Sequence, residues 1–212
     1  MSTPLRPLGP AWQPLLEAAV DALLRDGLDV SGLWPSASLR REALERLGAL
    51  LDLVATWNAR IDLTAARDER ELCDLYLSDA LVLAAHGARE GGAARPGWID
   101  VGSGAGAPGL ALHLLWPASE LTLVEPRQKR VAFLRSAAGR FPALPPVRVI
   151  EGRSLAVASA EHEVAVSRAT FAPAEWLKEG ARLARHPCER PLVVDSRCLL
   201  PALELGRRGA RE

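Results

Sequence analysis

Residues 98–109 read Trp-Ile-Asp-Val-Gly-Ser-Gly-Ala-Gly-Ala-Pro-Gly in a chain of 212 residues. The first four residues predict a buried strand, the next eight predict a loop of small residues, and residues 110–115 predict a helix. A strand, a glycine-rich loop and a helix in this order bind nucleotide-like cofactors, because small residues let backbone N–H groups and the helix N-terminus approach the ligand. The segment therefore predicts a cofactor-binding unit.

Two acidic residues favour S-adenosylmethionine as that cofactor. Gly104, Gly106 and Gly109 match the dinucleotide fingerprint, and Glu125 lies about twenty residues after them. In a dinucleotide site, however, the first glycine follows the strand directly, whereas here Asp100 precedes Gly102 by two positions. Asp100 can meet the ammonium group of S-adenosylmethionine, and the carboxylate of Glu125 can accept hydrogen bonds from ribose hydroxyls. A dinucleotide site and a purely structural glycine turn remain the less favoured interpretations.

Strands and helices alternate after this segment. The pattern predicts strands at 121–124, 147–150, 164–166 and 192–194, and helices at 129–139, 173–183 and 199–205. Such alternation is typical of an α/β fold with right-handed crossovers, a mainly parallel sheet and helices on both faces. Asp100, Glu125, Gly152 and Ser167 fall at or near strand ends, where such sheets bind ligands. We therefore expect one Rossmann-like site that includes these four residues.

Helices dominate the part of the chain before residue 98. Apolar residues recur at three- and four-residue spacing in 12–24, 39–58 and 69–86, and residues 87–97 are rich in glycine and alanine. We interpret 87–97 as a flexible linker. The sequence thus predicts an N-terminal helical extension over 1–90 and a cofactor-binding core over 91–212.

Composition limits the possible classes of protein. Lysine plus arginine equal aspartate plus glutamate at 26 each, so nucleic-acid binding requires a local basic patch. No apolar run is long enough for a membrane span, and the first residues lack a signal pattern. The three cysteines lack zinc-binding spacing, which indicates buried or free thiols in a reducing cytosol. We expect a cytoplasmic monomer without metal or membrane association.

Several motifs resemble one family. They lie between residues 57 and 169 and comprise Trp57-Asn58, Leu63-Thr64-Ala65, the Asp100–Gly109 loop with its Pro108-Gly109 end, Lys129-Arg130-Val131-x-Phe133-Leu134, and Ser167-Arg168-Ala169. In combination they resemble the RsmG or GidB family of bacterial methyltransferases, which modify N7 of a guanine in small-subunit (16S) ribosomal RNA. The resemblance implies a class I methyltransferase fold with S-adenosylmethionine as cofactor and ribosomal RNA or the 30S subunit as partner.

The resemblance, together with the strand ends, suggests a role for individual residues. We expect cofactor binding by Asp100, Gly102, Ser103, Gly104, Gly106, Pro108, Glu125, Arg153, Ser154 and Ser167. Arg168 is the candidate catalytic residue, since it can hold a phosphate or the guanine O6 edge by bidentate bonds. A salt bridge from Arg168 to Asp79 or Glu163 is an equally weighted alternative. Lys129, Arg130 and Asp79 are candidate substrate-binding residues, although a solvated surface explains them as well.

The substrate half departs from the family pattern. Leu75-Tyr76 stands where the family has Arg-His, Gly152-Arg153-Ser154 where it has Arg-Ala-Glu, and residues 192–196 offer Asp195 in place of a lysine. A reversed charge near RNA weakens affinity through lost phosphate contacts. Two alternative functions therefore stay open: methylation of another nucleic acid or a small molecule, and a non-catalytic cofactor-binding or interaction protein.

Overall fold

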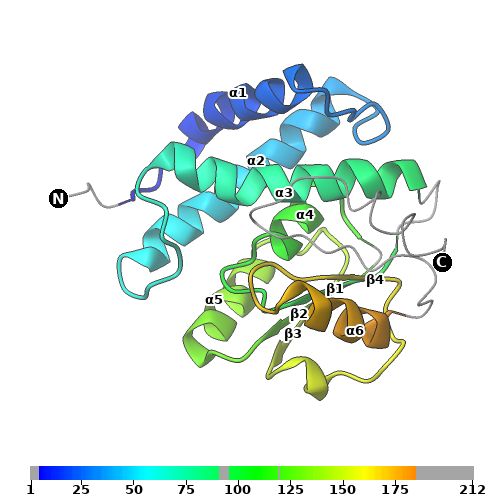
Figure 1. Ribbon diagram of the computed structural model, residues 1–212. Coiled ribbons are helices and arrows are strands. Elements are labelled where there is room, and N and C mark those ends of the chain that lie inside the picture. Colours follow the sequence, from blue (N-terminus) through cyan, green and yellow to red (C-terminus); the bar gives the residue numbers. More distant parts are fainter. Residues whose placement is uncertain (1–4, 91–95, 119, 185–212) are drawn as a thin grey trace.

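The computed structural model describes residues 5–90, 96–118 and 120–184 (Figure 1). The α-helices are α1 Trp12–Arg25, α2 Ala37–Asn58, α3 Glu69–Glu90, α4 Gly109–Leu115, α5 Gln128–Ala138 and α6 Pro173–Leu183. The strands are β1 Trp98–Val101, β2 Leu121–Glu125, β3 Val147–Glu151 and β4 Val164–Val166, and short 3₁₀ turns lie at Gly9–Ala11 and Ser154–Ala156. Within these ranges the predicted strands and helices are confirmed, while the strand at 192–194 and the helix at 199–205 lie outside the described residues.

The four strands form one parallel sheet in the order β3-β2-β1-β4. β1 lies at its centre, with Asp100 paired to Leu123 on β2 and to Val166 on β4. Parallel strands end at the same edge of a sheet, so the segments that follow them meet there. The expected α/β fold with a parallel sheet is confirmed.

Alternate residues of the strands face two apolar layers. Trp98, Leu121 and Leu123 belong to the larger buried cluster, whereas Ile99 and Val124 belong to the smaller one. This alternation follows from the two-residue period of a strand. Because both faces are covered, the strands β1 and β2 are buried along their whole length.

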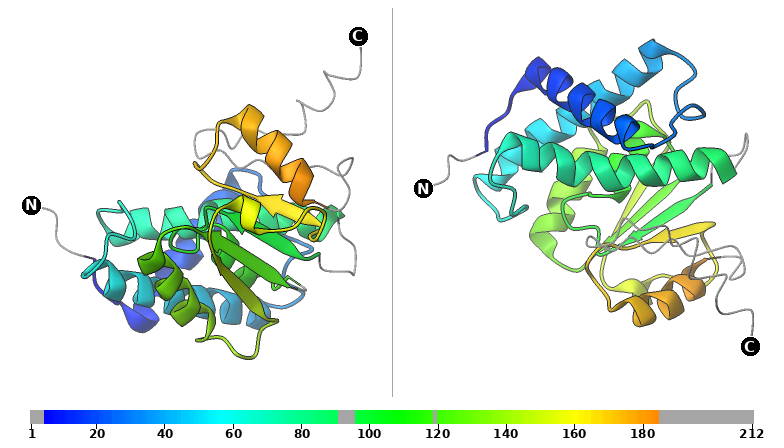
Figure 2. Two further views of the ribbon diagram at one scale, coloured as in Figure 1. Left: turned by 90° about the horizontal axis from the view of Figure 1, so that it is seen from below. Right: turned by 45° about the horizontal axis from the view of Figure 1, so that its top comes forward.

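The helices cover the two faces unequally. α4 and α5 pack on one face, with α1, α2 and α3 outside them, and α6 covers the other face next to β4 (Figures 1 and 2). The larger cluster joins α1, α2 and α3 to α4 and the strands without interruption. The N-terminal helices thus bury their apolar faces against the same sheet that carries the glycine loop.

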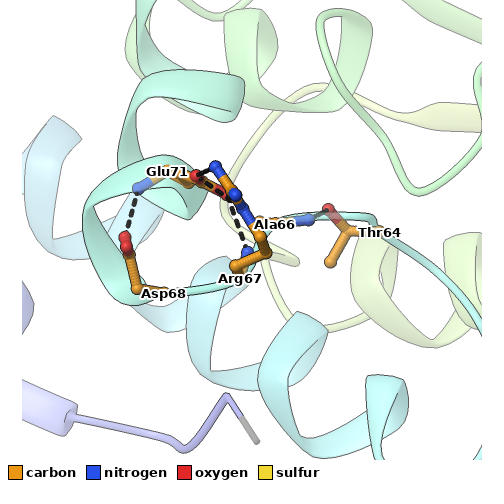
Figure 3. A network of polar contacts seen from close by, with 5 residues as sticks. All are labelled: Thr64, Ala66, Arg67, Asp68 and Glu71. Carbon is orange, nitrogen blue, oxygen red and sulfur yellow. Dashed lines mark hydrogen bonds and ion pairs between the residues drawn. The ribbon is translucent and has the colours of Figure 1, made fainter. Parts of the chain in front are cut away.

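Local capping explains where α2 and α3 begin. The hydroxyl of Ser36 accepts a hydrogen bond from the Leu39 N–H, which caps α2. At α3, Asp68 Oδ1 accepts from the Glu71 N–H at 2.9 Å, and the Glu71 carboxylate accepts from the backbone and the guanidinium of Arg67 (Figure 3). Asp68 is therefore the N-cap of α3, and Glu71 ties the residue before this cap to the first turn of the helix.

A polar side chain explains the turn that follows α2. Asn58 ends the helix, and its Oδ1 accepts the N–H groups of Leu63 and Thr64 at 2.9 and 3.1 Å. A short polar side chain that satisfies two later backbone donors favours a turn over a continued helix.

We predicted a linker over 87–97, and the start of this predicted range is too early. α3 continues through residue 87 to Glu90. A Cβ on Gly87 would lie 2.5 Å from the Trp116 ring and 3.4 Å from the Trp98 ring, so this glycine serves close packing inside the helix. Gly87, which we placed in the linker, is therefore a contact point between α3 and two tryptophans.

No helix in the described ranges is both long and apolar enough to cross a membrane.

Candidate functional site

The residues predicted at strand ends meet at the carboxyl edge of the sheet. Asp100 is the third residue of β1, Glu125 is the last of β2, and Gly152 and Ser167 directly follow β3 and β4. Hydrogen bonds join them: the Gly152 N–H donates to the Glu125 carbonyl at 3.1 Å, and the Ser167 hydroxyl donates to the Val101 carbonyl at 2.7 Å. The four segments therefore lie side by side at this edge.

Hydrogen bonds to β1 and β2 hold the loop that follows β1. The N–H groups of Gly102 and Ser103 donate to the Val124 carbonyl at 2.8 and 3.1 Å. The Ser103 hydroxyl donates to the Asp100 carbonyl at 2.8 Å and accepts from the Val124 N–H at 3.1 Å. Gly102, Gly104 and Gly106 all have positive φ, which is the conformation that glycine adopts at least cost. The fully buried Ser103 side chain therefore joins the loop to β1 and β2 by hydrogen bonds.

Asp100 fastens the far end of this loop. Its side chain is fully buried, and Oδ2 accepts the Gly109 N–H at 2.9 Å where α4 begins. A Cβ on Gly109 would lie 2.5 Å from that oxygen, so the backbone of α4 touches the carboxylate directly. Oδ1 is buried and has no hydrogen-bond partner among the described residues. A cation close to Oδ1 would compensate this buried acceptor.

Burial raises the pKa of Asp100 to about 7, because desolvation penalises its charged form. The Gly109 N–H and the positive charge of Arg168 act in the opposite direction, and the charge of Glu125 adds to the increase. The carboxyl group therefore changes its protonation near neutral pH.

Glu125 connects the loops after β1 and β2. Its Oε2 accepts the Gly104 N–H and its Oε1 accepts the Arg127 N–H, both at 2.9 Å. Each carboxylate oxygen has a second lone pair, so further donors such as two hydroxyl groups can still be accepted. The Cβ side of Gly104 is open, with the guanidinium of Arg130 as its nearest side chain at 3.7 Å.

The loop after β4 depends on α3. Arg168 Nη1 donates to the Leu75 carbonyl at 2.8 Å and to Asp79 Oδ2 at 3.2 Å, and both side chains are mostly buried. The ion pair that we weighed as an alternative for Arg168 is present with Asp79. Thr170 then covers the glycine loop, since a Cβ on Gly102 would lie 2.1 Å from its Oγ1.

Sequence reasoning missed Tyr76. Its hydroxyl donates to the Ala105 carbonyl at 2.7 Å from a fully buried position in α3. This residue falls within the helix predicted at 69–86, and we noted it as a departure from the family pattern. Its helical spacing is the same whether its hydroxyl bonds to a distant loop or not, so the sequence carries no signal for this contact.

Other predicted site residues lie in different settings. Pro108 is buried at the start of α4, where its carbonyl accepts the Leu112 N–H. Ser154 is buried, with its hydroxyl toward Glu179 and its carbonyl bonded to Arg182, so it faces α6. Arg153 and Lys129 are exposed. The structure therefore brings together the residues of β1, β2 and β4 more closely than those after β3.

The residues at the edge fit a cationic nucleoside. Asp100 offers a buried oxygen without a partner, Glu125 offers free lone pairs, and the glycine loop exposes backbone near Gly104. Within the described ranges no cluster of three or more potential metal ligands occurs. A parallel sheet covered on both faces, with this loop and these two acids at its carboxyl edge, defines a Rossmann-like class I methyltransferase domain.

Comparison with known proteins agrees with this class. The sequence model of the GidB family, described as rRNA small subunit methyltransferase G, matches residues 43–186. The chain belongs to this family of methyltransferases. The enzyme of that name from Neisseria gonorrhoeae is 35% identical over 164 residues, which cover 76% of this chain and 73% of the relative. Its counterpart from Halorhodospira halophila is 40% identical over 140 residues, which cover 66% and 63%.

One solved structure completes the comparison. Ribosomal protein L11 methylase from Lactobacillus delbrueckii subsp. bulgaricus superposes with a TM-score of 0.41 at 18% identity, over 62% of this chain and 65% of that chain. The family assignment does not depend on it.

Proposed function

We propose that this protein transfers a methyl group from S-adenosylmethionine to N7 of a guanine in small-subunit ribosomal RNA. One observation carries the proposal: a member of the rRNA small subunit methyltransferase G family has its two strand-end acids and its glycine loop joined at one edge. This arrangement favours S-adenosylmethionine over a dinucleotide. The Asp100 carboxylate attracts a cation such as the ammonium group, whereas it would repel the anionic pyrophosphate of a dinucleotide.

In the proposed cofactor site each acid has a separate task. Asp100 holds the Gly109 end of the loop and directs Oδ1 toward the ammonium group, while Glu125 accepts the ribose hydroxyls and fixes Gly104. When bound, the cofactor supplies an electrophilic methyl group on its sulfonium. Ser103, Gly102 and Gly106 keep the backbone close to it, and Ser167 aligns the neighbouring strand end.

The proposed reaction demands little acid–base chemistry from the protein. N7 of guanine has a free lone pair and no proton, so no residue has to remove one before attack. Catalysis then depends on holding the base in line with the methyl group. Arg168 is our candidate for that task, because it follows β4 at the same edge and its bonds to Leu75 and Asp79 both use Nη1. Its remaining N–H groups can bind the guanine O6 edge or a phosphate.

The other candidate residues have supporting roles in this proposal. Asp79 orients the Arg168 side chain, and Arg130 approaches the glycine loop from α5, with Lys129 beside it. Ribosomal RNA or the 30S subunit is the proposed partner, which places the protein in the cytoplasm. A single chain carries all the residues named here, so we propose a monomer.

Methyl transfer with labelled S-adenosylmethionine tests the proposal. We expect labelling of 30S subunits or naked 16S ribosomal RNA, recovery of the label as 7-methylguanosine after digestion, and no labelling of a pool of small molecules. Calorimetry should show cofactor binding. Absence of binding heat, or recovery of the label in another nucleoside or a small molecule, would contradict the proposal.

Arg168→Ala separates cofactor binding from substrate positioning. We expect methyl transfer to fall about 100-fold, as for the loss of a preorganised donor, while the cofactor Kd changes by a clearly smaller factor, because Arg168 is not a cofactor ligand and acts on Asp100 only through its charge. Equal losses in both measurements would show that Arg168 serves only the cofactor site.

A further inference from the structure

Residues 126–150 form the most basic part of this neutral chain. The segment contains Arg127, Lys129, Arg130, Arg135, Arg140 and Arg148 and has no acidic residue. The rest of the chain therefore has twenty bases and all 26 acids. A polyanion approaching the molecule meets net attraction at this segment and net repulsion elsewhere.

Five of these bases gather on α5 and its flanks. Val131, Phe133, Leu134 and Ala137 face the core, whereas Arg127, Lys129, Arg135 and Arg140 are exposed and Arg130 is half-buried. None of the five forms an ion pair with any other described residue, since the salt bridges found there involve other bases. Arg148 differs, because it lies 3.9 Å from Glu161. We call the other five the α5 basic surface.

The α5 basic surface begins at the cofactor site. α5 starts three residues after Glu125, and Arg130 Nη1 lies 3.7 Å from the Cβ position of Gly104. Eleven helical residues then lead about 16 Å away from the carboxyl edge. Arg135 lies in the last turn of α5, and Arg140 lies in the segment that joins α5 to β3. Figure 1 shows this segment at the end of α5. A strand of RNA whose guanine occupies the site can follow this helix outward.

A hollow with apolar walls lies at that far end. It has a volume of about 560 Å³ and is lined by Arg135, Phe141, Pro142, Leu144, Pro146 and neighbouring residues. Phe141 contributes an aromatic ring to the lining, the prolines contribute further apolar side chains, and Arg135 contributes a positive charge. Unpaired bases in RNA stack on aromatic rings and on arginine planes. Charge and shape together therefore fit a single-stranded nucleic acid better than a hydrophobic peptide.

We propose that the α5 basic surface binds the phosphates of the RNA strand that leads away from the target guanine, and that the hollow beside Phe141 receives an unpaired base of the same strand. This inference rests on the proposed function and extends it to a second contact region, remote from the methyl group.

A double substitution at the far end tests the inference. Arg135→Gln/Arg140→Gln removes two bases far from the cofactor loop, and Arg25→Gln/Arg70→Gln is the matched control with the same charge change on α1 and α3. We expect the first variant to bind naked 16S ribosomal RNA about tenfold more weakly at low salt, with the slope of log Kd against log salt reduced by about 1.5. The control variant and the cofactor Kd of both variants should match wild type.

Phe141→Leu tests the hollow separately. The substitution keeps an apolar side chain but removes the ring, so we expect about fivefold weaker binding of naked 16S ribosomal RNA with an unchanged salt slope. A thermal melt within about 3 °C of wild type would show that folding is preserved.

These experiments test RNA binding and methyl transfer separately, so the failure of one proposal can be distinguished from the failure of the other. Equal RNA affinity and salt slope for the two double variants would overturn the α5 basic surface even if methylation proceeds. A variant that binds naked RNA normally but no longer methylates 30S subunits would also overturn it, in favour of a contact with ribosomal protein. Wild type that binds RNA with the expected salt slope but transfers no methyl group would refute the proposed reaction and leave the surface intact.

Discussion

The loops after β1 and β4 lie at the same edge of the sheet, but different contacts hold them. The first is fixed by bonds to the adjacent strand β2 and to its own helix, through Ser103, Gly109 and Glu125. The second is fixed by Arg168, which reaches α3 some ninety residues earlier in the chain. The first loop is therefore a property of the βα unit itself, whereas the second depends on the N-terminal helices.

Gly109→Ala should have the largest effect, because it disturbs the contact between Asp100 and the end of the loop that follows β1. The new methyl group would lie 2.5 Å from Asp100 Oδ2 and 2.6 Å from its Cβ, and this short, fully buried side chain has no room to move away. We expect a loss of about 3 kcal/mol in the free energy of unfolding, measured in urea, and no detectable cofactor binding.

Gly139→Ala is the matched control for this substitution. Gly139 has helical φ, and its nearest Cβ neighbour is the Arg135 carbonyl at 3.4 Å, so stability should change by less than about 0.5 kcal/mol. If both variants were equally stable, the contact between Gly109 and the Asp100 side chain would not restrict the size of residue 109 as we describe.

Gly102→Ala should disturb the contact between the two loops. The methyl group would meet the Thr170 side chain at 2.1 Å, and alanine at φ +77° is strained. We expect a loss of about 2 kcal/mol in the free energy of unfolding, since strain of this kind costs about 1–3 kcal/mol. Adding Thr170→Gly should restore part of that loss, because the steric component disappears and the backbone strain remains. No recovery would mean that the loop after β4 moves aside at no cost.

The protonation of Asp100 should make cofactor affinity depend on pH. Its raised pKa of about 7 means that the carboxylate, which attracts the ammonium group, forms only as pH rises through that value. We expect the association constant from calorimetry to fall by up to about tenfold per pH unit below 7. The ammonium group stays charged over this range, since α-amino groups titrate near 7.7–8.0.

Asp100→Asn provides the control for this pH dependence. Affinity of the variant should be lower at pH 7.5 and nearly constant between pH 5.5 and 7.5, because the side chain no longer titrates. For the protein without cofactor the sign is reversed: the native state holds a proton that the unfolded chain releases, so wild-type stability should decrease as pH rises from about 4 to 7. If wild type and the Asp100→Asn variant showed the same pH profile, another titrating group would be responsible for the pH dependence.

Tyr76→Phe should have the smallest effect and tests the support of the first loop by α3. The substitution leaves the buried Ala105 carbonyl without its donor, at a cost of about 1 kcal/mol in the free energy of unfolding. Tyr76→Leu would add a cavity, so the phenylalanine variant is the cleaner measurement. An unchanged unfolding midpoint would show that the loop stands without this bond.

The sequence was most informative where contacts are local. Strand, loop and helix follow one another between Trp98 and Leu115, and the acids at the ends of β1 and β2 could be assigned to one edge from the parallel order alone. Of the contacts between distant segments, the Arg168–Asp79 ion pair was named only as one alternative, and those of Tyr76 with Ala105 and of Thr170 with Gly102 were not predicted. Gly87 shows the same limit, because only the two tryptophans packed against it explain a glycine within a helix.

The adjacency of Leu75 and Tyr76 in α3 has a thermodynamic consequence. One residue accepts a bond from Arg168 and the next donates a bond to Ala105, so a single turn of helix anchors both loops. Substitutions at Tyr76 and Arg168 should therefore be non-additive, and a double-mutant cycle between them should give a coupling free energy above the roughly 0.5 kcal/mol found for independent positions. The two positions lie 92 apart in the sequence but act on one common support.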